Sequence, residues 1–113
     1  MVTTISQKVA DSFNNKSGEA KQEMLQSEVI YEAKVQESIN AFNIFKSLCS
    51  KLYYAEGANK TAIQKQVDMA STSVFMSESE MSSAAEHYRG DCKWFQIMDT
   101  YATQADSIVN RYT

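Results

Sequence analysis

The chain has 113 residues with no proline, three glycines and two cysteines, and its 43% hydrophobic and 22% charged composition is that of one folded domain. Average usage would give about five or six prolines in this length. Their absence argues against a loop-rich enzyme or a sandwich with many turns and favours long, uninterrupted helices. The net charge is -3, with lysines and arginines scattered singly, which excludes the basic field that nucleic-acid binding needs.

The sequence also bears on where the protein is made. It contains no apolar run approaching the roughly 18 residues of a transmembrane helix, so we expect no transmembrane segment. The first residues lack the basic start and the apolar stretch of a signal peptide. We therefore expect synthesis in the cytoplasm without a signal peptide, with any export following a signal-less secretion route.

The first half of the chain predicts two helical elements. Ile5, Val9 and Phe13 recur at helical spacing and predict a short amphipathic segment over 4–14, before the cluster Asn14–Gly18. A long helix is then expected over 17–55, or from Thr4 if the N-terminal segment joins it without a break. Its apolar seam comprises Ala20, Met24, Ser27, Tyr31, Val35, Ser38, Phe42, Phe45, Cys49 and Leu52.

A turn over 56–59 separates this helix from a second long one over 60–111. Gly57 suits the position that follows the end of a helix, and Asn59 suits the N-cap of the next. The second helix keeps a heptad rhythm across Gly90, which we interpret as a tolerated weak point. Its seam comprises Ile63, Val67, Ala70, Val74, Ser77, Met81, Ala84, Tyr88, Asp91, Phe95, Met98, Ala102, Ala105, Val109 and Tyr112.

These elements predict an all-α protein of one domain, 1–113. The fold is a long antiparallel helical hairpin, coiled-coil-like, with a short N-terminal helical segment. Folding about Gly57 pairs residues whose numbers sum to near 115, which separates Cys49 from Cys92 too far for an intramolecular disulfide. The residues expected to hold the hairpin core are Val35, Phe42, Phe45, Leu52, Val67, Val74, Phe95 and Val109.

The chain carries more apolar residues than one seam can bury, and the stretch 41–54 at the end of the first long helix is apolar around most of its circumference. A second stripe on the long C-terminal helix is rich in the residue types that are enriched at interfaces. We predict that it mediates self-association into a homo-oligomer, although the N-terminal segment could instead fold back and cover it. This predicted interface comprises Met69, Met76, Trp94, Ile97, Tyr101 and Ile108.

The chemistry-bearing residues do not form a recognisable catalytic or metal site. The single histidine, His87, has Glu80 and Asp91 within reach along a helix, which a solvated ionic cluster explains more simply than a metal centre. The three glycines stand alone, so no phosphate-binding loop is present, and no nucleophile elbow occurs. We predict no enzyme activity, no catalytic residue, no metal and no cofactor.

In architecture the chain resembles two groups of secreted helical proteins. The mid-chain turn is similar to that of the WXG100 proteins of type VII secretion, with Tyr54-Ala55-Glu56-Gly57 where that family has Trp-x-Gly. The proline-free hairpin with a long C-terminal seam looks like the needle and filament subunits of type III secretion. Together they imply a self-associating structural subunit of a filament or secretion-type assembly. The alternative is a small cytosolic adaptor or secretion chaperone that binds other helical proteins.

Overall fold

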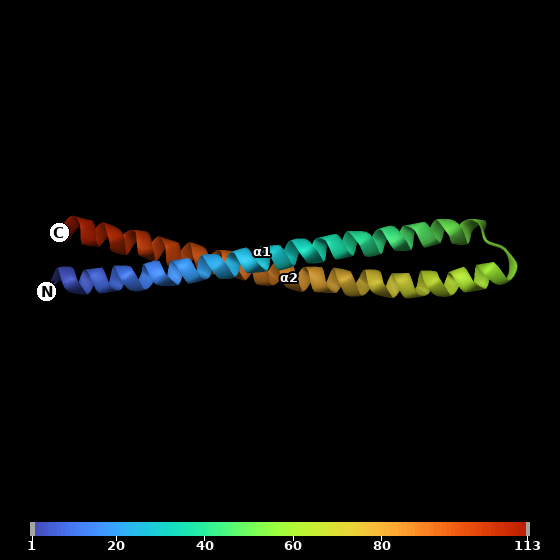
Figure 1. Ribbon diagram of the computed structural model, residues 1–113, viewed down its shortest axis with the longest axis horizontal. Helices are drawn as coiled ribbons and strands as arrows, with labels where there is room; N and C mark the ends of the chain where they lie inside the picture. The colour runs from blue at the N-terminus through green and yellow to red at the C-terminus, as the bar shows by residue number, and fades with distance from the viewer. Residues whose placement is uncertain (1, 113) are drawn as a thin grey trace. The chain divides into compact units, whose positions relative to one another are not determined.

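A computed structural model describes residues 2–112 and confirms the antiparallel helical hairpin. The chain is all-α, with helix α1 over Val2–Tyr54 and helix α2 over Gly57–Tyr112. The two helices run side by side in opposite directions, joined by the short turn at Ala55 and Glu56 (Figure 1). The absence of proline permits helices of 53 and 56 residues, because a proline in the interior of either would remove a backbone hydrogen bond.

The turn is shorter than predicted. The backbone N–H of Ala55 donates to the carbonyl of Leu52 at 3.2 Å, which closes the end of α1. Gly57 then adopts a φ of +63°, the left-handed conformation that glycine tolerates because it lacks a Cβ atom. Helix α2 begins at Gly57, so Asn59 lies within its first turn and is not the N-cap.

The separate N-terminal segment is a wrong prediction, because α1 continues through Asn14–Gly18 without a break. This stretch contains no proline, and the side-chain amide of Asn14 donates to the carbonyl of Ala10 at 2.8 Å. Ser17 is buried, so this part of α1 packs against α2. Packing therefore outweighs the weak helix propensity of asparagine and glycine. Helix α2 likewise continues through Gly90, as predicted.

The hairpin consists of two compact units, and each unit contains a part of both helices. Unit 1 comprises residues 2–29 of α1 with 86–112 of α2, and unit 2 comprises residues 30–85, which include the turn. In both, cross-helix side-chain contacts join residues whose numbers sum to 114–120, as between Ser27 and Asp91 in unit 1 and between Lys34 and Glu80 in unit 2. The predicted pairing near 115 is thereby confirmed within each unit.

The seam of α2 is confirmed in full over the described side chains. Every predicted seam residue from Ile63 to Val109 is buried or half-buried, and Tyr112 lies outside the described side chains. Among the predicted core residues, Val67 is buried, whereas Val35, Phe45, Leu52, Val74, Phe95 and Val109 are half-buried. Half-burial is what a two-helix seam provides, because no further layer of the described residues covers these side chains.

The seam of α1 follows a strict alternation of three and four residues that differs from the predicted one. Its small members pack most closely: Ala10, Ala20 and Ser27 are each at most 3% exposed. All of its members are buried or half-buried, and they are Ser6, Ala10, Phe13, Ser17, Ala20, Met24, Ser27, Tyr31, Lys34, Ser38, Ala41, Phe45, Leu48 and Leu52.

Phe42 is therefore a wrong core prediction. It is 51% exposed, because Ala41 occupies the seam position and one residue along a helix turns the side chain by about 100°. Ile5 and Val9, which defined the predicted N-terminal stripe, are likewise exposed, and the seam there passes through Ser6 and Ala10. In each case the more apolar neighbour of the seam residue points to solvent.

The buried small residues yield a first prediction. Ala20→Asp should destabilise the protein by on the order of 3 kcal/mol, because it places an unpaired carboxylate in the seam. Ala33→Asp, the same change at an exposed position of α1, should cost about 1 kcal/mol or less from helix propensity. Urea unfolding followed by circular dichroism measures both. Equal losses for the two variants would contradict the placement of Ala20.

Candidate interaction surface

An apolar stripe on α2 in unit 1 forms the main candidate surface. Its members Trp94, Ile97, Tyr101 and Ile108 are each 44–49% exposed. Their spacing of three, four and seven residues places them along one side of the helix, about 90° around the axis from the seam. These four residues are called the α2 stripe below. It repeats with the period of the seam but lies outside the contact between the two helices.

The α2 stripe is anchored to α1 at one point. The ring of Tyr101 meets the ring of Phe13 edge-on, with centroids 5.5 Å apart and planes at 64°. The ammonium group of Lys16 lies over the ring of Phe13, 5.5 Å from its centroid. Such aromatic contacts restrict the Tyr101 side chain, so that part of the stripe is held in place while half of its surface remains open.

Met69 and Met76, the other predicted interface residues, belong to unit 2. They are 72% and 60% exposed, and their separation of seven residues places them on one side of α2. The structure therefore groups four of the six predicted residues in unit 1 and leaves the two methionines as a separate patch of unit 2.

Sequence reasoning missed much of the exposed apolar surface, chiefly on α1. These residues lie between the seam positions and form no long stripe of their own, so spacing offered little signal for them. They are Ile5, Val9, Leu25, Val29, Ile30 and Ile39 on α1, together with Phe75 on α2. Phe42, Ile44, Tyr53 and Tyr54 lie in the stretch 41–54, whose surplus of apolar residues the sequence does indicate, and all four are exposed.

A shallow apolar groove crosses the two helices in unit 2. It has a volume of about 380 Å³, and Phe42 lines it from α1 while Val74 and Met81 line it from α2. Val35 and Ile39 complete the apolar wall. The groove exists because Phe42 lies beside the seam and not in it, so its ring, 6.4 Å from that of Phe45, forms a rim.

Unit 1 also contains three polar contacts across the helices, each from a neutral group on α1 to an aspartate on α2. The hydroxyl of Ser27, 3% exposed, lies 2.6 Å from Oδ2 of Asp91. The hydroxyl of Ser17 lies 3.5 Å from Oδ1 of Asp99. Nearer the chain ends, Asn14 donates to Asp106 at 3.0 Å.

The histidine cluster is only partly assembled. Nε2 of His87 lies 3.5 Å from Oδ2 of Asp91, but the imidazole is 72% exposed. Glu80 belongs to unit 2 and pairs with Lys34 instead. Among the described residues, no group of three histidine, cysteine, aspartate or glutamate side chains is placed to hold a metal ion. Cys49 and Cys92 are both free and half-buried, in different units.

Lys34 occupies a polar position of the seam in unit 2. Its ammonium group donates to Glu80 across the helices at 3.1 Å and to Glu37 along α1 at 3.3 Å. The hydrogen bond to Glu80, followed by that to Glu37 and by the attraction of both carboxylates, raises the pKa of Lys34 above 10.5. The ion pair of Lys34 with Glu80 thus takes the place of an apolar contact between the two helices at this position of the seam.

Comparison of the chain with protein-family models, with curated proteins and with solved structures finds no match. Neither helix, over the part of the chain that the structure describes, combines the length and the hydropathy needed to cross a bilayer. The interpretation of the surface therefore depends on the geometry above.

The buried contact of Ser27 yields a second prediction. Ser27→Ala should cost about 1–3 kcal/mol of unfolding free energy, because Asp91 loses its donor within the seam. Ser82→Ala, at an exposed position of α2, removes the same hydroxyl and gains the same helix propensity without touching the seam. The difference between the two variants in urea unfolding isolates the contact, and a difference near zero would contradict its role.

The raised pKa of Lys34 yields a third prediction. A lysine whose pKa is higher in the folded state stabilises the protein while it is charged in both states, and this contribution is lost as the pH rises through the folded value. The stability difference between the wild type and Lys34→Gln should therefore be constant up to about pH 9.5 and shrink above 10.5. Urea unfolding over this range tests it, and a difference that grows with pH would contradict it.

Proposed function

We propose that this protein is a non-enzymatic structural subunit that self-associates through the α2 stripe. The observation that carries the proposal is the heptad spacing of Trp94, Ile97, Tyr101 and Ile108 at about half exposure, outside the seam. A helix with a second apolar stripe of this period is suited to pack against another helix. Tryptophan and tyrosine are also the residues that contribute most at interfaces.

A second copy of the chain fits this stripe. Trp94 and Ile108 lie seven residues on either side of Tyr101, so these three residues have the same spacing in both directions, and Ile97 lies between Trp94 and Tyr101. An antiparallel copy would set Trp94 against Ile108 and Tyr101 against its own equivalent, as a twofold contact requires. Lys93, Thr100 and Ser107 border the stripe away from the seam, and in this register the lysine faces a hydroxyl and no like charge.

Whether the assembly is a closed dimer or an open filament depends on the patch of Met69 and Met76 in unit 2. A subunit with one twofold surface closes into a dimer, whereas a subunit with a second, different surface can continue into an open assembly. The two exposed methionines supply an adaptable apolar patch of that kind. A filament or secretion-type assembly is the form that we propose when both surfaces are used.

The fourth prediction tests the stripe. Trp94→Ala should reduce self-association at least tenfold, because truncation of a tryptophan that anchors an interface costs about 2 kcal/mol or more. Phe75→Ala, at a 68% exposed aromatic position of unit 2 outside the stripe, is the matched control. Sedimentation velocity at rising concentration measures the change, with circular dichroism to verify that both variants stay helical.

The outcomes of this experiment separate the forms of the proposal. A wild type that remains monomeric at high concentration would contradict self-association, and a Trp94→Ala variant that assembles normally would show that another face is used. Electron micrographs of concentrated wild-type protein distinguish filaments from discrete particles.

The groove of unit 2 favours a second candidate, an adaptor or chaperone that binds a helix of another protein. Its apolar wall, formed by Phe42, Val74 and Met81 among others, suits the apolar face of an amphipathic helix. A monomeric wild type whose binding to an amphipathic helical peptide is lost in Phe42→Ala, but kept in Trp94→Ala, would favour this candidate over self-association.

A further inference from the structure

The turn end of unit 2 is cationic, although the chain as a whole is anionic. Residues 40–77 contain four lysines, Lys46, Lys51, Lys60 and Lys65, against the two acids Glu56 and Asp68, which gives +2. The chain has a net charge of -3, so the residues outside this segment carry -5. The segment comprises the turn and the adjoining parts of both helices, and we call it the basic tip.

The four lysines of the basic tip are available to a partner. All four are exposed. The ion pairs of the described residues involve Lys34 and His87 but none of these four lysines. Their charge is therefore not neutralised within the hairpin, and it adds to the field at the turn.

The lysines are arranged symmetrically about the turn. Lys51 and Lys60 each lie three residues from the adjoining helix end, about 4.5 Å along the axis, and Lys46 and Lys65 lie eight residues away, about 12 Å. The two lysines on each helix are five residues apart and so point about 140° away from each other. A partner that lies along one side of the hairpin would meet only some of them, whereas a surface that faces the turn attracts all four.

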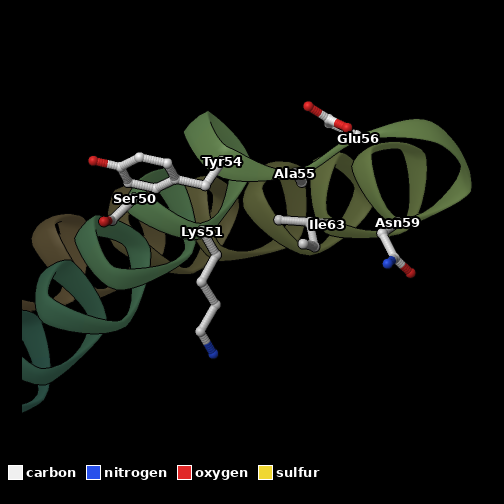
Figure 2. Close-up of a pocket in the computed structure, with 7 residues that line it drawn as sticks. All are labelled: Ser50, Lys51, Tyr54, Ala55, Glu56, Asn59 and Ile63. Atoms are coloured by element: carbon white, nitrogen blue, oxygen red, sulfur yellow. The ribbon is translucent and has the colours of Figure 1, made fainter.

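Two tyrosines occupy the same end. Tyr53 and Tyr54, in the last turn of α1, are 82% and 80% exposed, and their rings pack edge-on at 5.0 Å. Tyr54 and Lys51 extend from the end of α1 beside an open hollow of about 550 Å³, with Glu56 projecting from the turn (Figure 2). Tyrosine rings with basic neighbours are the combination that proteins place at the headgroup level of a bilayer.

We propose that the basic tip docks end-on onto an anionic phospholipid bilayer. The lysines supply the attraction to the negative surface, and the two tyrosine rings enter the headgroup layer. The screening length at physiological ionic strength is about 8 Å. Lys51 and Lys60 therefore contribute more than Lys46 and Lys65. The association is peripheral and is reversed by salt.

Cosedimentation of the full chain with vesicles tests this proposal. One vesicle preparation contains one part phosphatidylserine to three parts phosphatidylcholine, and the other contains phosphatidylcholine alone. The protein should bind the first at low salt and bind the second weakly. Lys51→Gln with Lys60→Gln should lower the partition coefficient about 25-fold, because each lysine near an anionic bilayer contributes about fivefold. The same change at Lys46 and Lys65 should have a smaller effect.

Two controls make the result specific. Lys8→Gln with Lys21→Gln removes the same charge at exposed positions of unit 1 and should leave vesicle binding nearly unchanged. Tyr53→Ser with Tyr54→Ser should weaken binding without changing its dependence on salt. The tip variants should keep the sedimentation of the wild type without vesicles, so this proposal and self-association through the α2 stripe can fail separately.

Three results would overturn the proposal. Equal binding to the two vesicle preparations would exclude recognition of anionic lipid. An equal loss in the Lys8 and Lys21 control would show a general charge effect with no role for the tip. Absence of binding to the phosphatidylserine vesicles at low salt would exclude the bilayer and leave an acidic protein surface as the partner of the lysines.

Discussion

The structure depends on one constraint, which is that two helices share one seam in each unit. A seam buries one narrow side of each helix, so any other apolar residue is left at the surface. This explains why small side chains such as Ala10 and Ala20 are among the most buried, while Trp94 and Phe75 remain exposed. The exposed apolar surface is thus a direct consequence of the architecture, and extended surface of this kind commonly marks a site of association.

Polar residues within the seam give the pairing its register. Apolar contacts between heptads are nearly equivalent when one helix slides by seven residues, but the contact of Ser27 with Asp91 has a partner in one register only. Lys34 with Glu80 has the same effect in unit 2. Such groups contribute less burial than an apolar pair would, and their benefit is a defined alignment of α1 with α2.

Apolar and charged surfaces are distributed differently between the two units. The α2 stripe lies in unit 1, whereas the basic tip and the Phe42 groove lie in unit 2. An apolar stripe with heptad spacing suits another helix, and exposed lysines around a turn suit a negatively charged surface. We therefore assign the two proposed interactions to different surfaces, which allows one molecule to use both.

The heptad spacing alone determined the fold class and the seam of α2, because a repeat kept over many turns admits one phase. The tertiary structure decided the exposure of the α2 stripe, because the N-terminal residues continue α1 and do not fold back over it. On α1 the spacing fits both Phe42 and Ala41, and the larger, more apolar phenylalanine is the one that sequence reasoning places in the core. The tertiary structure decided for alanine, because the alternating seam steps four residues from Lys34 to Ser38 and therefore three residues from Ser38 to Ala41. Tertiary packing likewise kept α1 helical through Asn14–Gly18, where local propensity predicted a break. The turn brought Lys51 and Lys60 to one end, a proximity that depends on the fold and not on their spacing in the chain.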